Sequence, residues 1–323
     1  MRAVRFEQAG GPEVLQLVEV ETPQPGEGQI LVRHEAIGVN FIDTYFRSGL
    51  YPAKLPSPLG NEAAGVVEAV GAGVTRFRAG DRVAYAMGVM GAYADYAVAS
   101  AERAVKLPDG IGARTAAAGL LKGMTTEFLI RRLHRVQPGE TILAHAAAGG
   151  VGQIMVQWAK ALGAVVIATV GSEAKAARVR ELGADHVILY RDQDVAAEVR
   201  RITDGKGVSV AYDSVGKDTF EGTLGSVAKR GLFVSFGNAS GPPPAVEAGR
   251  LMRAGSLFFT RPTMGDYLAT TEDLDASAAA LFEMIGSGQV KIEIGQTFPL
   301  AEARKAHEAL ASRATVGASL LIP

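Results

Sequence analysis

The segment 147–152, with the sequence AAGGVG, constrains the fold of this chain more than any other stretch. It follows the apolar run 141–146 and opens a helical pattern whose apolar residues share one face over 151–162. A strand, a glycine-rich turn and a helix are what a dinucleotide pyrophosphate needs, because free N–H groups at the helix N-terminus face its phosphate oxygens. We expect Gly150 to let the backbone approach the pyrophosphate and Gly152 to let the helix sit close to the sheet. An alanine replaces the first glycine of the usual fingerprint, so the match depends on its context.

The context is an alternation of short apolar runs with helical patterns. We expect strands over 165–170, 186–190, 208–212, 231–236 and 257–260, and helices over 173–182, 195–202 and 219–230. Such an alternation predicts an α/β fold in which a parallel sheet is wound on both faces by helices. Ligands of these sheets bind at the carboxyl ends of the strands, so the residues that follow each strand are candidates for the site.

The two ends of the chain differ from the middle. Strand-like runs punctuated by glycine and proline lie at 30–36, 63–70, 82–86 and 93–98, and they predict a mostly β domain. The C-terminal part has helical patterns at 277–285 and 301–311 and a final strand at 318–322. Because a terminal strand needs a sheet partner, we expect it to rejoin the N-terminal β domain.

A chain of 323 residues is long for one core, which favours two domains. We place a doubly wound dinucleotide-binding domain over 119–264, inserted between the two parts, 1–118 and 265–323, of a mostly β catalytic domain. The formal net charge is −1 and the charges are scattered, which does not favour nucleic acid or an anionic membrane as the main partner. The N-terminus has no apolar region of the kind found in secretory signal peptides, and no apolar run reaches the roughly 18 residues of a membrane-spanning helix. We therefore expect a cytoplasmic protein.

Several short motifs, taken together, resemble a known family. They are NFIDTY at 40–45, GNEAAG at 60–65, GDRV at 80–83, YDSVG at 212–216, SFGN at 235–238 and SRAT at 312–315. A further signature is matched at GE 139–140, Leu143, AAGG 147–150, Gly152, Gln157 and Lys160. The chain resembles the medium-chain dehydrogenase/reductase superfamily and, within it, the NADPH:quinone oxidoreductase (zeta-crystallin-like) branch. The resemblance covers nearly the whole chain and implies a Rossmann-type domain with a GroES-like catalytic domain formed by both ends of the chain.

The comparison with zinc enzymes of that superfamily predicts a metal-free site. Those enzymes bind catalytic zinc through cysteine, histidine and cysteine, and the aligned positions here are Asn40, Asn61 and Lys122. An amide is a poor zinc ligand and an ammonium group cannot be one. The chain has no cysteine, so a four-cysteine structural zinc site and a thiol nucleophile are excluded as well. We expect Glu62 and Lys122 to form a buried pair in the volume of the missing metal.

A metal-free site favours an activated hydride acceptor. Zinc stabilises the alkoxide in alcohol oxidation, and without it an unactivated carbonyl is hard to reduce. A quinone accepts hydride readily, because its reduction product is aromatic. The protein then needs only to align the nicotinamide with the acceptor, exclude water and offer a donor to the developing phenolate. The sequence therefore predicts hydride transfer from NADPH to a quinone.

The preference for NADPH is predicted from the end of the second strand. NAD-specific folds usually carry Asp or Glu there, whereas this strand is followed by Gly171 and Ser172, which leave room for a 2′-phosphate and can hydrogen-bond to it. Lys175 can supply charge, or it is an ordinary exposed lysine. Glu173 is the residue that opposes this interpretation, unless it points outward from the first helical turn. Tyr190 could reach the phosphate or adenine, or it covers an apolar edge.

Other cofactor contacts come from the glycine-rich turn and from the resemblance. The turn supplies Ala148, Gly149, Gly150 and Val151. The resemblance implies nicotinamide contacts at Val215, Phe236, Gly237, Asn238 and Phe259, and a further phosphate contact at Arg313. Phe236 and Phe259 are equally candidates for core aromatics, and Arg313 for a solvated side chain.

The acceptor pocket is expected between the two domains, near Asn40, Asp43, Tyr45 and Arg261. Tyr45 could orient the nicotinamide or a quinone oxygen, and its alternative role is a loop aromatic that covers the β domain. Asn40 is equally well explained as a structural amide. Arg261 could orient a quinone oxygen or a phosphate, or form an interdomain ion pair. No essential general base is predicted, because hydroquinone oxygens can take protons from water.

Three functions remain open on the sequence alone. The first is an NADPH:quinone oxidoreductase. The second is a zinc-free, NADPH-dependent reductase of the C=C bond of an alkenal or enone on the same scaffold. The third is a binding protein, because members of this branch serve as lens structural proteins or contact AU-rich RNA, although the balanced charge does not favour RNA. The resemblance also implies a homodimer formed by edge strands within 231–260.

Overall fold

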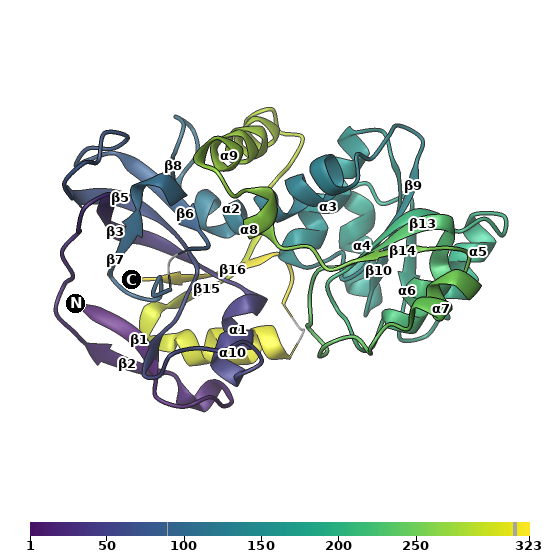
Figure 1. Cartoon of the computed structure of the whole chain (residues 1–323), viewed down its shortest axis with the longest axis horizontal. Helices are drawn as coiled ribbons and strands as arrows, with labels where there is room; N and C mark the ends of the chain where they lie inside the picture. The colour runs from purple at the N-terminus through teal and green to yellow at the C-terminus, as the bar shows by residue number, and fades with distance from the viewer. Residues whose placement is uncertain (89, 313–314) are drawn as a thin grey trace. The chain divides into compact units, whose positions relative to one another are not determined.

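The computed structural model describes residues 1–88, 90–312 and 315–323, and the chain forms two compact units (Figure 1). Unit 1 comprises Met1–Met124, Leu268–Gly286 and Ile292–Pro323. Unit 2 comprises Thr125–Tyr267 and Ser287–Lys291. None of the helices in the described part of the chain is long and apolar enough to cross a bilayer.

Unit 2 is built on a six-stranded parallel sheet. Its strands are β9 (Thr141–Ala144), β10 (Val165–Val170), β11 (His186–Leu189), β12 (Val208–Asp213), β13 (Val227–Ser235) and β14 (Phe258–Thr260). The order across the sheet is β11-β10-β9-β12-β13-β14, so the direction of winding reverses between β9 and β12. This is the doubly wound order of dinucleotide-binding sheets, which confirms the predicted fold class.

Helices connect the strands of unit 2 and cover both faces of the sheet. They are α3 (Gly150–Ala161), α4 (Glu173–Glu181), α5 (Val195–Ile202), α6 (Phe220–Ser226), α7 (Ala248–Arg253) and α8 (Met264–Tyr267). Consecutive strand residues point to opposite faces, yet Ile142 and Leu143 are both fully buried, as are Val210 and Ala211. A strand buried on both faces explains why these runs are continuously apolar in the sequence.

One predicted element of unit 2 is wrong. The helix expected over 219–230 ends at Ser226, and β13 begins at Val227. Val227 pairs with Val208 of the neighbouring strand, and its side chain is fully buried in the hydrophobic core of unit 2. Sheet pairing and burial therefore override the local helix preference of this stretch.

Unit 1 contains a seven-stranded mixed sheet and a smaller three-stranded sheet. The large sheet has the order β15-β16-β3-β5-β6-β8, and β7 pairs with β3 off this path. Its strands are β3 (Gln29–Val39), β5 (Glu62–Val70), β6 (Arg82–Ala86), β7 (Tyr96–Ser100), β8 (Ala104–Lys106), β15 (Ile294–Pro299) and β16 (Ala318–Ile322). The small sheet consists of β1 (Arg2–Phe6), β2 (Gln16–Glu19) and β4 (Ser57–Pro58).

The C-terminal strand completes the large sheet of unit 1. β16 runs antiparallel to β3, with Leu320 opposite Gly38. This pairing confirms that the end of the chain returns to the N-terminal β structure, and Figure 1 shows the yellow β16 among the purple and blue strands.

Four helices belong wholly or partly to unit 1: α1 (Phe41–Ser48), α2 (Ala113–Glu127), α9 (Thr271–Gly286) and α10 (Ala303–Ala311). Short helical turns lie at Pro12–Val14, Ala101–Arg103 and Leu300–Glu302, and a π-helical turn at Phe128–Leu133 follows α2 in unit 2. α9 begins earlier than the predicted 277–285. Thr270 and Asp273 form a reciprocal cap, in which the Thr270 hydroxyl accepts from the Asp273 N–H and donates to its carboxylate. This threonine-x-x-aspartate pattern is the sequence signal that marks the true start of the helix.

Candidate active site

The glycine-rich turn between β9 and α3 has the close packing that a pyrophosphate site requires. A Cβ atom on Gly152 would lie 2.5 Å from both the Ala146 carbonyl oxygen and the Ala147 Cα, so only glycine fits. This confirms the predicted role of Gly152 in seating the helix. Ala146 adopts a left-handed conformation with φ of 50°, which is uncommon for a non-glycine residue. α3 begins at Gly150, and the first N–H groups of a helix have no partner within it.

Three buried residues that the sequence analysis missed, His145, Thr169 and Thr223, hold this turn in place. The imidazole of His145 hydrogen-bonds to the hydroxyl of Thr169 at 2.9 Å and to that of Thr223 at 2.9 Å. Burial lowers the pKa of His145, which keeps the ring neutral. The Thr223 hydroxyl also lies 2.8 Å from the Asp213 carboxylate. The ends of β9, β10 and β12 are thereby tied together through α6.

The Asp213 carboxylate also shapes the turn that follows β12. It accepts hydrogen bonds from the N–H groups of Val215 (2.7 Å) and Gly216 (3.0 Å) and from the Thr219 hydroxyl (2.7 Å). These bonds fix the backbone at Val215, one of the predicted nicotinamide contacts. The sequence signal was an aspartate placed directly at the end of a buried strand.

The residues predicted for the nicotinamide end mostly gather at the carboxyl ends of β12 and β13. A Cβ atom on Gly237 would lie 2.2 Å from the Ser214 carbonyl oxygen, so the two turns are in direct backbone contact. The N–H of Phe236 donates to the Asp213 carbonyl at 2.8 Å. Phe236 and Asn238 are half-buried beside this contact.

Phe259 has a different environment. It lies in β14, and its ring packs edge-on against Phe233 at 5.1 Å and against Phe220 at 6.4 Å. This is the core-aromatic role that the sequence left open, and a nicotinamide contact by Phe259 stays a prediction. Arg313 lies outside the described residues.

The residues predicted for the 2′-phosphate lie close together after β10 and β11. A Cβ atom on Gly171 would lie 2.8 Å from the Tyr190 hydroxyl, so this hydroxyl covers the glycine. Lys175, on the first turn of α4, has its pKa lowered by burial and by the nearby Arg191 guanidinium. Two cations held near each other favour an anion between them. Arg191 was missed in the sequence, although it directly follows Tyr190.

Glu173 does not interfere with such an anion site. Its carboxylate forms an ion pair with Arg180 at 2.5 Å on the exposed surface of α4. The side chain is 65% exposed, as expected for a first-turn acid that points outward. Ser172, the residue before α4, is also exposed.

The residues predicted for the acceptor side in unit 1 form a buried polar network. The Asn40 amide donates to Glu62 at 2.8 Å, and the Asn61 amide donates to Asp43 at 2.8 Å. The Lys122 ammonium lies 3.0 Å from the Glu62 carboxylate, and both side chains are almost fully buried. This confirms the predicted Glu62–Lys122 pair. The same hydrogen bonds give Asn40 the role of a structural amide, which was the alternative to contact with the acceptor.

Tyr45 and Arg261, the other two candidates for the acceptor side, lie in different units. Tyr45 is 9% exposed and lies on α1, so the alternative of a loop aromatic is wrong. Its ring meets Tyr51 edge-on at 5.3 Å. Arg261 belongs to unit 2, where its guanidinium donates to the Ser235 carbonyl at 2.9 Å.

The polar network does not fit a zinc ion. Its donors at the aligned positions are two amides and an ammonium group that is already paired with Glu62. Within residues 1–88, 90–312 and 315–323, no cluster of three or more His, Asp or Glu side chains is arranged to hold a metal. Amides and ammonium groups are not among the ligands that zinc uses in proteins.

The sheet order, the glycine-rich turn and the mixed β unit define a dinucleotide-binding dehydrogenase or reductase. Residues 26–109 match the family model of the alcohol dehydrogenase GroES-like domain, and residues 150–283 match that of the zinc-binding dehydrogenase. A quinone oxidoreductase of Pseudomonas aeruginosa is 54% identical, with 100% of this chain and 99% of the relative covered.

Two further relatives cover nearly the whole chain. The crystal structure of the Escherichia coli quinone oxidoreductase complexed with NADPH has a TM-score of 0.99, at 50% identity, with 100% of both chains covered. A 2-haloacrylate reductase of Burkholderia sp is 44% identical, with 99% of this chain and 98% of the relative covered. The chain belongs to the quinone oxidoreductase family of the medium-chain dehydrogenases/reductases.

Proposed function

We propose that this chain is an NADPH-dependent quinone oxidoreductase that works without a metal ion. The observation that carries the proposal is the Glu62–Lys122 ion pair at the position where zinc enzymes of the superfamily bind their metal. A site that cannot polarise a carbonyl with zinc needs an acceptor that is already electrophilic. The likeness to quinone oxidoreductases over the full chain supports the same acceptor class.

The residues of unit 2 fit the parts of the dinucleotide. The turn 148–151 would hold the pyrophosphate, because it opens α3, whose first N–H groups have no partner within the helix. Gly171, Ser172, Lys175 and Tyr190 would hold the 2′-phosphate. NADPH supplies the hydride when it is bound.

The nicotinamide end would lie against the two joined turns of unit 2. We propose Val215, Phe236, Gly237 and Asn238 as its contacts, because the Asp213 hydrogen bonds fix these turns. Phe259 has less support as a nicotinamide contact, because its ring packs into the core.

On the acceptor side we propose contacts from Asn40, which caps α1, from Tyr45 of α1 and from Arg261. A phenol, an amide and a guanidinium all carry donors that stabilise a developing phenolate. Asp43 is fully buried, so we assign it a positioning role rather than contact with the acceptor. We also propose that the functional domains are 1–118 with 265–323, and 119–264.

Two measurements test this function. Turnover with NADPH should be much faster with 1,2- and 1,4-quinones than with 2-alkenals, and a strong alkenal preference would overturn the assignment. Metal analysis of the purified protein should find less than stoichiometric zinc, and dialysis against a chelator should leave turnover unchanged. Stoichiometric zinc would contradict the metal-free mechanism.

A C=C reductase is the second candidate. The observation that favours it is the full-length likeness to the Burkholderia 2-haloacrylate reductase. An acrylate acceptor carries a carboxylate, which a quinone does not. A competition assay between 2-haloacrylate and a quinone, at one NADPH concentration, therefore distinguishes the two functions.

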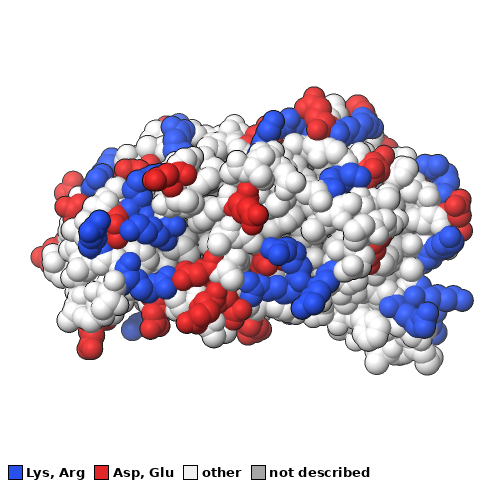
Figure 2. All heavy atoms as spheres, turned by 90° about the horizontal axis from the view of Figure 1, so that it is seen from above, with Lys and Arg blue, Asp and Glu red and all other residues white. Residues whose placement is uncertain are grey.

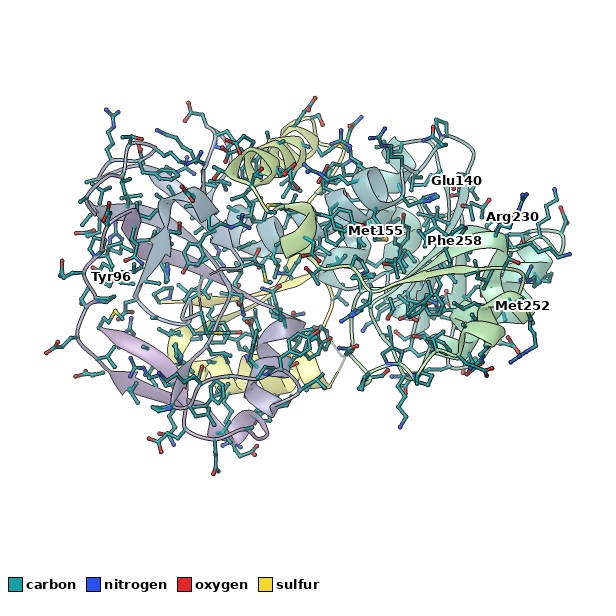
Figure 3. All side chains as sticks on the ribbon, viewed as in Figure 1. Tyr96, Glu140, Met155, Arg230, Met252 and Phe258 are labelled. Carbon is teal, nitrogen blue, oxygen red and sulfur yellow. The ribbon has the colours of Figure 1, made fainter. Side chains whose placement is uncertain are left out.

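We further propose that the protein is a cytoplasmic homodimer formed by β14. This strand is the edge of the parallel sheet, and its Phe258 side chain is 64% exposed. Met252, in the preceding helix α7, is 65% exposed, and both residues are labelled in Figure 3. An unpaired edge with large apolar side chains is a typical interaction surface. A nucleic-acid partner is not favoured, because acidic and basic side chains are mixed on the face shown in Figure 2.

A further inference from the structure

A line of buried polar side chains in unit 1 begins and ends on α1 and passes through α10. The Arg47 guanidinium lies 3.2 Å from His307 Nδ1, and the Tyr93 hydroxyl lies 3.0 Å from His307 Nε2. The Tyr93 hydroxyl also donates to the Asp43 carboxylate at 3.0 Å. Arg47 is 7% exposed, and the other three are fully buried. The four residues come from α1, from the segment before β7, and from α10.

The hydrogen bonds of this line all point toward Asp43. A guanidinium group can only donate, so His307 Nδ1 must accept from Arg47 and the ring proton must lie on Nε2. His307 therefore donates to the Tyr93 oxygen, and the Tyr93 proton is left for Asp43. Burial and the Arg47 charge lower the pKa of His307 to about 3, so the ring stays neutral in this role.

Asp43 receives donors on both carboxylate oxygens. Its Oδ1 accepts from the Asn61 amide at 2.8 Å, and its Oδ2 accepts from the Asn40 backbone N–H at 2.8 Å and from Tyr93. A proton on this carboxyl would displace one of three donors. Burial raises the pKa of Asp43 to about 6, while Asn61, Asn40, Tyr93 and the Lys122 charge act against that rise.

We propose that Tyr93, His307 and Arg47 are positioning residues of the acceptor site, which hold Asp43 as an ionised carboxylate that in turn fixes the Asn40 backbone and the Asn61 side chain. The inference rests on the proposed function only in assigning Asn40 to the acceptor end. The directional hydrogen bonds and the burial of the carboxylate are independent of that assignment.

A second histidine–tyrosine pair in unit 1 shows that such a pair needs no carboxylate. The Tyr85 hydroxyl lies 2.8 Å from His34 Nε2, and His34 Nδ1 lies 2.7 Å from the Ala94 carbonyl. Tyr85 is as fully buried as Tyr93. The two pairs differ in that the Tyr93 pair ends on a charged group, which makes Tyr85 a matched control.

The titration of Asp43 is influenced by groups from each element packed around it. Lys122 comes from α2, and Glu62 lies on β5 and shares Asn40 with Asp43. The Glu13 carboxylate acts on Arg47. The remaining groups are Tyr93, His307 and Arg47 themselves.

The test compares Tyr93→Phe with Tyr85→Phe. Both variants lose a buried hydroxyl–imidazole hydrogen bond, but only Tyr93→Phe also removes a donor from Asp43. Infrared difference spectroscopy of the protein alone, with Asp43→Asn to identify the band, measures the carboxyl titration. Tyr93→Phe should raise the Asp43 pKa by about one pH unit or more, because hydrogen bonds to charged groups are the stronger ones. Tyr85→Phe should leave it in place.

The kinetic profile supplies the second measurement. The acid limb of kcat/KM for the quinone should move upward by about one pH unit in Tyr93→Phe, a roughly tenfold loss on that limb. The dissociation constant of NADPH should stay unchanged. His307→Phe leaves the Tyr93 donor on Asp43 but removes the partner that orients it, so it should move the limb in the same direction by a smaller amount. His307→Gln, which keeps one donor and one acceptor, should restore much of the parent profile.

The possible results distinguish a failure of the positioning role from a failure of the proposed function. If Tyr93→Phe does not fold, the His307→Phe and His307→Gln pair gives the same comparison. Equal effects of Tyr93→Phe and Tyr85→Phe, or an unmoved Asp43 titration, would overturn the positioning role. A parent protein that does not reduce quinones, but whose Asp43 titration moves in Tyr93→Phe, would refute the function and retain the hydrogen-bonded line.

Discussion

Protonation of His34 should weaken unit 1 as the pH falls below neutrality. The His34 ring is fully buried, its Nδ1–H donates to the Ala94 carbonyl, and its Nε2 accepts from the Tyr85 hydroxyl. Both ring nitrogens of the neutral imidazole therefore have a hydrogen-bond partner. A second proton on the ring, at Nε2, would point at the Tyr85 hydroxyl, which already donates its own proton there. Burial lowers the pKa of His34 from 6.5 to about 4, although the Ala94 carbonyl and Asp95 act in the opposite direction.

The sign and the size follow from the two pKa values of His34. Because the unfolded chain binds the proton more tightly, the stability that His34 contributes is fully present above pH 6.5 and is lost as the pH falls toward 4. The full difference between 6.5 and about 4 corresponds to about 3 kcal/mol. Between pH 7 and pH 5, about 2 kcal/mol of that stabilisation should be lost.

The comparison of parent protein with His34→Gln isolates this contribution. Hydrogen exchange of the β3 amides at pH 7 and pH 5, corrected for the intrinsic rates, reports the opening free energy of unit 1. The parent should lose about 2 kcal/mol more than His34→Gln over this range, because the effects of Asp43 and His307 cancel in the difference. The substitution His186→Gln, at an exposed position in unit 2, is the control. An NMR titration that places the His34 midpoint between pH 6 and 7 would refute the reasoning.

Three further predictions concern unit 2. Gly152→Ala should weaken NADPH binding by at least about tenfold, because the added methyl group overlaps Ala146 and must displace α3, and unchanged affinity in a fluorescence titration would contradict the packing argument. Lys175→Ala should weaken NADPH by about tenfold and leave NADH unaffected, because only NADPH carries the 2′-phosphate; equal losses would remove Lys175 from that site. Phe258→Asp should convert the proposed dimer to a monomer in sedimentation, and a persistent dimer would exclude β14 as the interface.

The sheet of unit 2 could be predicted because its signals are local. Each buried strand is a short apolar run, and each helix repeats its apolar positions within a few turns. The same local reasoning failed at 227–230, where the residues read as helix. Pairing with Val208 decides the structure there, and a pairing partner so far away in the sequence leaves no trace in the local pattern.

The sequence supplied candidate site residues where they follow a strand end, and it missed buried residues whose contacts join distant segments. Gly171, Tyr190 and Lys175 could be named because the dinucleotide fold fixes which residues follow which strand. His145 was treated only as one of five scattered histidines, although it joins the ends of three elements through two hydroxyl groups. Spacing along the chain carries no information about such a contact.

Helix α1 shows why a hydrophobic pattern cannot reveal the polar network of unit 1. The most buried side chains of this helix are Asp43, Tyr45 and Arg47, while Phe41 and Phe46 are only half-buried. A pattern that assigns only apolar residues to the core misses this, because Phe41 and Phe46 pack against the core of unit 1 but are buried less deeply than Asp43 and Arg47. Burying two charged side chains in place of two phenylalanines costs stability unless each charge has its partners. Local rules of stability are broken in this way mainly at functional sites. The burial of these charges therefore supports our proposal that α1 contributes to the acceptor site, and it is also the feature that a hydrophobic pattern cannot predict.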